Sequence, residues 1–204
     1  MGKTDLRSED VAGHGAFRHL SGIAGIAVDL RYATPDNFVG RDLYSPLDCA
    51  WLHRDAAVAL ENAVRWLSAW HPAYRLLVLD ALRPQRVQRQ LWECLLGTEL
   101  LAYVAEPERG SIHSFGMAVD VTLVDRQGRE LDMGTGFDDL SERSHPVLEA
   151  RMLDEGLLGA RQVAHRQLLR DAMFQAGWSG IHSEWWHFDC GDRERVRREY
   201  SRVL

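Results

Sequence analysis

The sequence predicts a mixed α+β protein with a largely antiparallel central sheet flanked by helices. Three segments carry apolar residues at helical spacing, and apolar runs of strand length lie between them. These segments do not alternate regularly, as a doubly wound parallel sheet would require. With 204 residues, of which 46% are hydrophobic, the chain is long enough to bury a substantial core. We therefore expect a single domain over residues 1–204.

The first half of the chain predicts a helix, a strand and a second helix. Apolar side chains repeat at helical spacing over residues 55–70, and a His-Pro pair follows the end of this segment. Residues 75–81, RLLVLDA, form an apolar run of strand length. Arg83 and Pro84 begin a helix that continues through about Leu96, because proline is well tolerated at the first helical position.

The second half predicts a hairpin, a helix and a last strand. Residues 118–124, AVDVTLV, alternate as a strand, DRQG at 125–128 predicts a turn, and RELDM at 129–133 predicts the returning strand. A third helix is expected over residues 162–176, where a glycine follows. EWWHFDC at 184–190 predicts the final strand.

The charge pattern argues against nucleic acid as a partner. The formal net charge is −6, Lys3 is the only lysine, and the arginines are scattered along the chain. Residues 193–202 are locally basic, but Asp192, Glu194 and Glu199 interrupt or border this run. We therefore expect it to form a solvated helix face.

Cysteine usage and hydropathy indicate a cytoplasmic protein. Cys49, Cys94 and Cys190 are odd in number and show no paired spacing, which is typical of reduced thiols. No segment resembles a secretory signal or is apolar over a length that spans a membrane. We expect no membrane partner.

Two short motifs contain the residues of a zinc hydrolase. A catalytic zinc site uses three protein ligands and a nearby carboxylate that manages the proton of a water molecule. SIHSFGMAVD at 111–120 offers His113 and Asp120, and SEWWHFD at 183–189 offers Glu184 and His187. Gly116 allows a tight turn after His113, before the strand that carries Asp120. These residues predict a metal site with Glu184 as the carboxylate.

The spacing of the second motif leaves two interpretations open. Glu184 and His187 would point to opposite faces of a regular strand, so both reach one metal only if the chain bends near Trp185. Alternatively, the segment is an edge strand in which Glu184 faces solvent and His187 is hydrogen-bonded. Arg83 is equally open: it either pairs with Asp80 at a helix start or stabilises an oxyanion during attack on a carbonyl.

Six blocks of sequence resemble the D-alanyl-D-alanine dipeptidases of the vancomycin-resistance type, which are relatives of the D-Ala-D-Ala carboxypeptidases. The similarity spans about residues 29–189. The blocks are DLRYATPDNFVGRDLY at 29–44, DALRP at 80–84, SIHSFGMAVDVTL at 111–123, DMGTGFD at 132–138, ERSH at 142–145 and EWWHF at 184–188. The resemblance implies the D-Ala-D-Ala carboxypeptidase and Hedgehog-like zinc peptidase fold, and hydrolysis of the free dipeptide D-Ala-D-Ala.

The resemblance also implies a role for each matching residue. One zinc ion per chain is bound by His113, Asp120 and His187, with Glu184 as the catalytic acid and base and Arg83 as the transition-state stabiliser. Tyr32, Ser111 and Asp138 match positions that surround the bound dipeptide in the family. His145 also matches, but the ligand set is complete without it, so we expect a structural role.

Three departures from the family pattern bear on the substrate. Leu82 stands where the family usually has tyrosine, and Phe115 and Met117 replace an arginine and a small residue. Because these changes make the pocket more apolar, other small dipeptides of D-residues are alternative substrates. A D,D-carboxypeptidase acting on peptidoglycan peptides and a zinc-binding interaction domain without catalysis are the rival functions. The interaction domain would have little reason to keep Glu184 together with Arg83.

Overall fold

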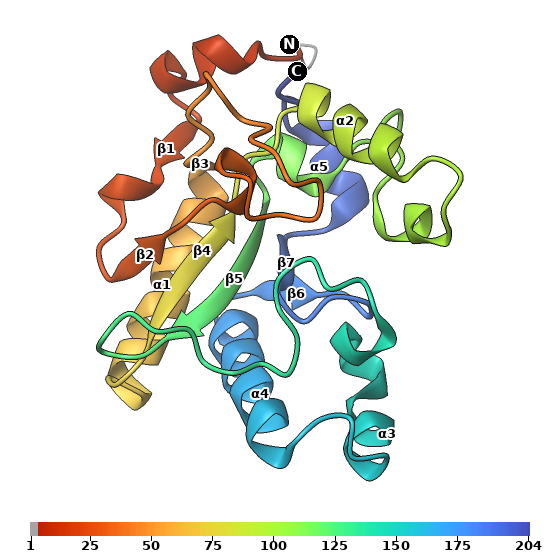
Figure 1. Cartoon of the computed structure of the whole chain (residues 1–204). Helices are drawn as coiled ribbons and strands as arrows, with labels where there is room; N and C mark the ends of the chain where they lie inside the picture. The colour runs from red at the N-terminus through yellow and green to blue at the C-terminus, as the bar shows by residue number, and fades with distance from the viewer. Residues whose placement is uncertain (1–3) are drawn as a thin grey trace.

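The computed structural model describes residues 4–204 and places a five-stranded sheet at the centre of the molecule (Figure 1). The strand order is β2-β4-β5-β7-β6. The pairing of β2 with β4 is parallel, and the other three pairings are antiparallel. The strands are β2 (Ile26–Val28), β4 (Arg75–Asp80), β5 (Ala118–Val124), β7 (His187–Cys190) and β6 (Trp178–Gly180). The predicted mixed α and β structure with a largely antiparallel sheet is therefore confirmed.

A second, two-stranded sheet joins β1 (Phe17–His19) to β3 (Trp51–His53) in antiparallel register. It packs against the chain just before β5, where a Cβ on Gly116 would lie 2.7 Å from the backbone nitrogen of His53. None of the short strands β1, β2, β3 and β6 follows from the sequence pattern.

Helices α1 (Arg54–Trp70) and α4 (Ala160–Gln175) pack together and against one face of the main sheet (Figure 1). Leu60 of α1 and Leu169 of α4 are fully buried in the same core as Val121 of β5. Apolar residues at helical spacing thus form the face that covers the sheet. The predictions of helices at 55–70 and 162–176 and of strands at 75–81 and 118–124 are confirmed to within two residues at each end.

The remaining helices are shorter than α1 and α4. The predicted second helix is α2 (Gln85–Leu95), and Pro84 occupies its N-cap position. The basic run near the C-terminus forms the short helix α5 (Arg193–Glu199), whereas α3 (Glu149–Asp154) was not predicted. Within residues 4–204, every helix is too short or too polar to span a bilayer. The three cysteines form no disulfide.

The hairpin prediction is wrong in its second strand. After the turn, the chain returns only far enough for an isolated bridge between Val124 and Glu130 and a hydrogen bond from Leu131 to Leu123. The next two carbonyl groups contact side chains of α4. The carbonyl of Asp132 lies against the ring of His165, and Arg166 donates a hydrogen bond to the carbonyl of Met133. These contacts direct the segment toward α4 and away from β5.

The sheet face opposite α1 and α4 carries polar side chains. Along β4 and β5 the register shifts between Val78 and Asp80, so that Asp80 lies opposite Asp120. Such a bulge re-aims a side chain. On the other side of β5, Asp120 is the register partner of His187. Asp80, Asp120 and His187 therefore form one row across three neighbouring strands.

Candidate active site

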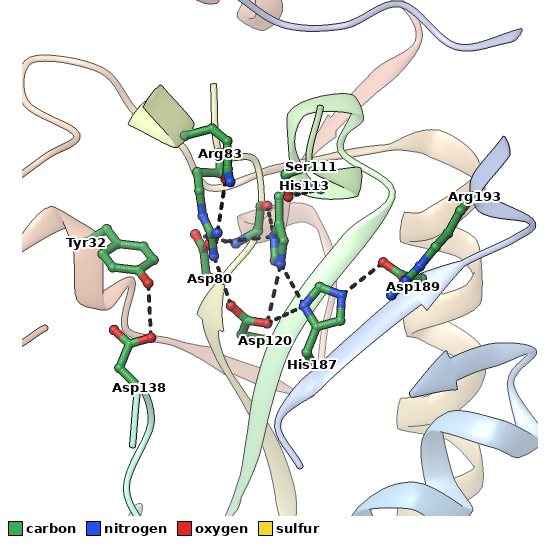
Figure 2. Close-up of polar contacts among 12 residues, drawn as sticks. Tyr32, Asp80, Arg83, Ser111, His113, Asp120, Asp138, His187, Asp189 and Arg193 are labelled. Carbon is green, nitrogen blue, oxygen red and sulfur yellow. Dashed lines mark hydrogen bonds and ion pairs between the residues drawn. The ribbon is translucent and has the colours of Figure 1, made fainter. Parts of the chain in front are cut away.

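Three side chains on this polar face bring ligand atoms together at the spacing of a metal site (Figure 2). Nε2 of His113 lies 3.2 Å from Nδ1 of His187. Oδ1 of Asp120 lies 3.0 Å from that Nδ1 and 3.3 Å from that Nε2. Ligand atoms of a tetrahedral zinc site, with bonds of about 2.0–2.1 Å, are separated by about 3.3 Å. The triangle therefore fits one face of a zinc tetrahedron.

The outer nitrogens of both rings have partners that aim the inner nitrogens at this point. Nδ1 of His113 lies 2.8 Å from the carbonyl oxygen of Ala81, and Nε2 of His187 lies 2.9 Å from Oδ1 of Asp189. Each acceptor takes a ring N–H, which leaves the lone pairs of the inner nitrogens facing Asp120. Three acceptors thus converge on one point, an arrangement that suits a cation.

Local sequence explains how His113 reaches the row. Residues Ile112–Phe115 form a single 3-10 turn, capped at its start by the hydroxyl of Ser111, which accepts from the backbone N–H of His113. Gly116 ends the turn with φ of 64°, a left-handed conformation that favours glycine. The chain then enters β5, where the side chain of Asp120 lies beside that of His113. The tight turn expected after His113 is confirmed.

Glu184 lies in an irregular segment before β7 and lines the same cavity as the three ligand-like residues. The predicted strand over 184–190 is wrong at its start, because β7 begins at His187. The bend that the motif needs near Trp185 is present. Burial raises the pKa of Glu184 to about 7. A carboxyl group with this pKa is able to accept and return a proton near neutral pH.

The segment that carries Glu184 is fixed by a buried arginine on α4. Nε1 of Trp185 donates to Oγ1 of Thr135 over 2.8 Å, and Nη2 of Arg166 donates to the same oxygen over 3.3 Å. The guanidinium of Arg166 also lies 5.7 Å from the centre of the Trp185 ring. Arg166 is fully buried, so it supports this segment from within the core.

Arg83 makes the pair with Asp80 that one of its two sequence interpretations expected, and it also lines the cavity. It forms an ion pair with the buried carboxylate of Asp80 at 2.6 Å and a second one with Oδ2 of Asp120 at 3.2 Å. Its guanidinium lies 4.9 Å from the centre of the Tyr32 ring and also lines the cavity. Arg83 therefore orients Asp120 and places a fixed positive charge beside the metal-type site.

Tyr32 and Asp138 form the cavity wall on the opposite side from Asp189 (Figure 2). The hydroxyl of Tyr32 donates to Oδ1 of Asp138 over 3.0 Å. Oδ2 of Asp138 is buried and has no hydrogen-bond partner among residues 4–204. Burial raises the pKa of Asp138 to about 8. Asp138 also has φ of 62°, an uncommon conformation for a residue other than glycine.

The remaining residues singled out in the sequence differ in whether they line the cavity. Ser111 is buried and lines the cavity. His145 lines it as well, but its Nε2 lies 2.8 Å from the hydroxyl of Tyr103, and it is not part of the metal-type group. Phe115 and Met117 are buried in the core beside β5, and Leu82 is buried in a separate cluster near Phe17. These three residues do not line the cavity, so the expectation that they make the pocket more apolar is wrong.

Sequence reasoning missed Asp189, although a signal for it was present. Asp189 follows His187 by two positions, and residues two apart on a strand share a face. The solvated face predicted for residues 193–202 is wrong in part: Arg195 and Arg198 are exposed, but Arg193 and Arg197 line the cavity. A charge run carries no local signal for the side that a helix turns inward.

Comparison with known proteins extends the resemblance to nearly the whole chain. The family model described as D-ala-D-ala dipeptidase matches residues 17–204. The D-alanyl-D-alanine dipeptidase of Escherichia coli (strain K12) is 38% identical over 164 residues, which are 80% of this chain and 78% of that relative. The enzyme of the same name from Enterococcus faecalis is 30% identical over 190 residues, a match that covers 82% of this chain and 87% of that relative. A third, from Enterococcus faecium, is 30% identical over 193 residues, covering 83% and 88%.

The match runs from the first strand of the small sheet to the C-terminus. It includes α5 and the residues after it, which the motif blocks alone did not reach. The chain belongs to the D-ala-D-ala dipeptidase family.

Proposed function

We propose that this chain is a single zinc dipeptidase domain that hydrolyses the free dipeptide D-alanyl-D-alanine to two molecules of D-alanine. The observation that carries the proposal is the triangle of acceptor atoms from His113, Asp120 and His187, whose sides of 3.0–3.3 Å match a tetrahedral zinc site. The names of the three relatives support the substrate.

His113, Asp120 and His187 would hold one zinc ion per chain, through Nε2, Oδ1 and Nδ1. A bound zinc ion supplies Lewis-acid chemistry, because it polarises a carbonyl group and lowers the pKa of a water molecule. Asp189 and the carbonyl of Ala81 keep the two rings in the tautomers that this requires.

Glu184 and Arg83 perform the remaining chemistry. Glu184 accepts a proton from the attacking water and then delivers it to the leaving amine nitrogen, for which a pKa of about 7 is suited. Arg83 donates hydrogen bonds to the oxyanion that develops on the scissile carbonyl. Its ion pairs with Asp80 and Asp120 hold the guanidinium in place before the substrate arrives.

Asp138, Tyr32 and Ser111 bind the substrate. The buried Oδ2 of Asp138 lacks a partner in the described residues, and a substrate ammonium group supplies the missing donor. Tyr32 holds the other carboxyl oxygen in place. An acylated or extended peptide would set Asp138 against a neutral amide, at a cost of about 1–3 kcal/mol for the unpaired group.

The proposal also includes the fold family and the cellular compartment of the enzyme. The antiparallel sheet with a metal-type site on one face supports the fold of the D-Ala-D-Ala carboxypeptidases and Hedgehog-like zinc peptidases. Three cysteines without a disulfide support the expectation of a cytoplasmic enzyme.

The test is the release of free D-alanine from four compounds by the zinc-loaded protein. We expect rapid cleavage of D-Ala-D-Ala and slow cleavage of N-acetyl-D-Ala-D-Ala and of the cell-wall pentapeptide. L-Ala-L-Ala should not be cleaved, because its methyl groups would face the opposite walls of the cavity. A chelator should remove the activity, and added zinc should restore it. Faster cleavage of the pentapeptide than of the free dipeptide would favour the D,D-carboxypeptidase instead.

A further inference from the structure

Two arginines of the C-terminal helix α5 line the same cavity as the metal-type site. Arg193 and Arg197 are four residues apart, so they lie on the same side of the helix. Arg195 and Arg198 lie on the same helix, but they do not line the cavity, and they pair with Glu199 instead. The inward side of α5 is therefore cationic.

Arg193 lies across the metal-type group from Asp138, and Arg197 lies one helical turn from Arg193 on the same side of α5. Figure 2 shows Tyr32 and Asp138 on one side of His113, Asp120 and His187, and Asp189 with Arg193 on the other. Nε of Arg197 donates to the carbonyl of Gly110 over 3.2 Å, directly before Ser111. The cavity thus has an acidic end and a basic end, with the reacting position between them.

The acidic groups next to these arginines are already paired. Oδ1 of Asp189 contacts His187, and its Oδ2 accepts a hydrogen bond from Nε of Arg193. Glu194 is shared between Arg109 and Arg197. Both oxygens of Asp189 are therefore engaged. Nη1 of Arg193 has no hydrogen-bond partner among residues 4–204, and this side chain is 47% exposed.

The size of the cavity shows why a second charged end is needed. Its volume is about 800 Å³, which lies within the range of pockets that hold ligands much larger than a dipeptide. Volume alone does not restrict the length of the substrate. A free dipeptide carries an ammonium at one end and a carboxylate at the other, so a group that senses each end selects for it.

We propose that Arg193 and Arg197, with Ser111, form the subsite that binds the free carboxylate of the substrate. The inference rests on the proposed dipeptidase function and assigns the end of the substrate opposite to Asp138. Arginine suits this role because its planar donors match a carboxylate. Burial lowers the pKa of Arg197, so an approaching anion also relieves the cost of its charge.

The experiment compares D-Ala-D-Ala with its C-terminal amide, which keeps the ammonium and the scissile bond but lacks the negative charge. In the zinc-loaded wild type, we expect kcat/KM to be about 10- to 100-fold higher for the acid, as for loss of a charge-assisted hydrogen bond. Arg197→Gln and Arg193→Gln should each lower kcat/KM for the acid about tenfold, mostly through KM. Turnover of the amide should stay within about twofold.

Arg195→Gln and Arg198→Gln are the matched controls and should keep the full preference for the acid. Arg197→Gln is the decisive variant, because Arg197 does not contact the partner of a metal-type histidine; for Arg193→Gln, zinc content is measured as well. A preference for the acid that survives in both variants would overturn the inference while leaving the dipeptidase function intact. A wild type that cleaves neither compound would overturn the dipeptidase function and this inference together.

Discussion

Two neighbouring residues belong to two different buried charged clusters. Trp185 contacts the cluster around Arg166, and Glu184 lines the cavity beside the metal-type cluster. In the cluster around Arg166, each guanidinium nitrogen has an acceptor: the carbonyls of Met133 and Arg143, Glu149, and Thr135. In the metal-type cluster, three acceptor atoms face one another at 3.0–3.3 Å. Burial alone therefore does not distinguish a structural cluster from a functional one, whereas the balance of donors and acceptors does.

This comparison predicts opposite responses to mutation. A cluster in which every donor has an acceptor supports the fold. Its loss should lower the free energy of unfolding, while the affinity of the folded protein for zinc stays unchanged. A cluster with excess acceptors binds a ligand, so its loss should remove zinc and activity first. The variants below test this separation.

The largest effect is expected from His113→Ala and His187→Ala. Each removes one of three acceptors, so the zinc content of the purified protein should fall from about one equivalent to near zero, and dipeptide hydrolysis should be lost with it. Metal analysis and the D-alanine assay measure both. His145→Ala is the control and should keep its zinc, because His145 contacts Tyr103. Full zinc and activity in both ligand variants would show that the cluster is not the metal site.

The next largest effect separates the proton carrier from the metal ligands. Glu184→Gln keeps the shape of the side chain but removes its ability to accept a proton, so kcat should fall by a factor of about 10² to 10⁴. Its zinc content should match that of the wild type. If this variant were fully active, Glu184 could not be the acid and base.

Arg166→Met should act on stability. It leaves two backbone carbonyls and part of the charge of Glu149 without partners, which should lower the free energy of unfolding by about 3–5 kcal/mol. Denaturant unfolding of the zinc-loaded protein measures this loss. Arg151→Met is the control, because the exposed pair of Arg151 and Glu142 should contribute less than about 1 kcal/mol. Equal losses in the two variants would remove the distinction between saturated and exposed pairs.

The smallest effect concerns Asp138, the acid at the far end of the cavity. Burial raises its pKa to about 8, above that of the unfolded chain. The unfolded state therefore loses this proton first, and the contribution of Asp138 to stability, fully present below about pH 4, declines as pH rises toward 8. Asp138→Asn does not ionise and should escape this decline.

Thermal denaturation without substrate, at about pH 5 and about pH 8, tests this expectation. The gain in melting temperature of Asp138→Asn over the wild type should be larger at the higher pH, while its KM for the dipeptide rises. A gain that is the same at both pH values would mean that Asp138 is already ionised in the free enzyme.

Long periodic segments and compact motifs could be predicted from the sequence. The helices α1 and α4 and the strands β4 and β5 each carry enough apolar residues to define a period. The metal-type residues could be predicted because their motifs resemble those of a known family. The strands β1, β2, β3 and β6 span three residues each, too few for a period, and they exist because a neighbouring strand pairs with them.

Contacts between distant segments were the other part that the sequence did not reveal. The returning segment pairs with β5 no further than Leu131, and Arg166 donates to the carbonyl of Met133, a contact across 33 positions. The inward side of α5 depends on how that helix packs against the turn at Ile112–Phe115. Neither contact leaves a local pattern in the residues themselves.

The row formed by Asp80, Asp120 and His187 has a consequence for biosynthesis. His187 lies near the C-terminus and joins the row only when β7 pairs with β5. Because a protein is synthesised from its N-terminus, Asp80 and Asp120 leave the ribosome while His187 is still enclosed or not yet made. At that stage the nascent chain lacks His187, one of the three proposed ligands, and Glu184, the proposed acid and base. On the proposed assignment, the set of ligands is completed only when β7 pairs with β5.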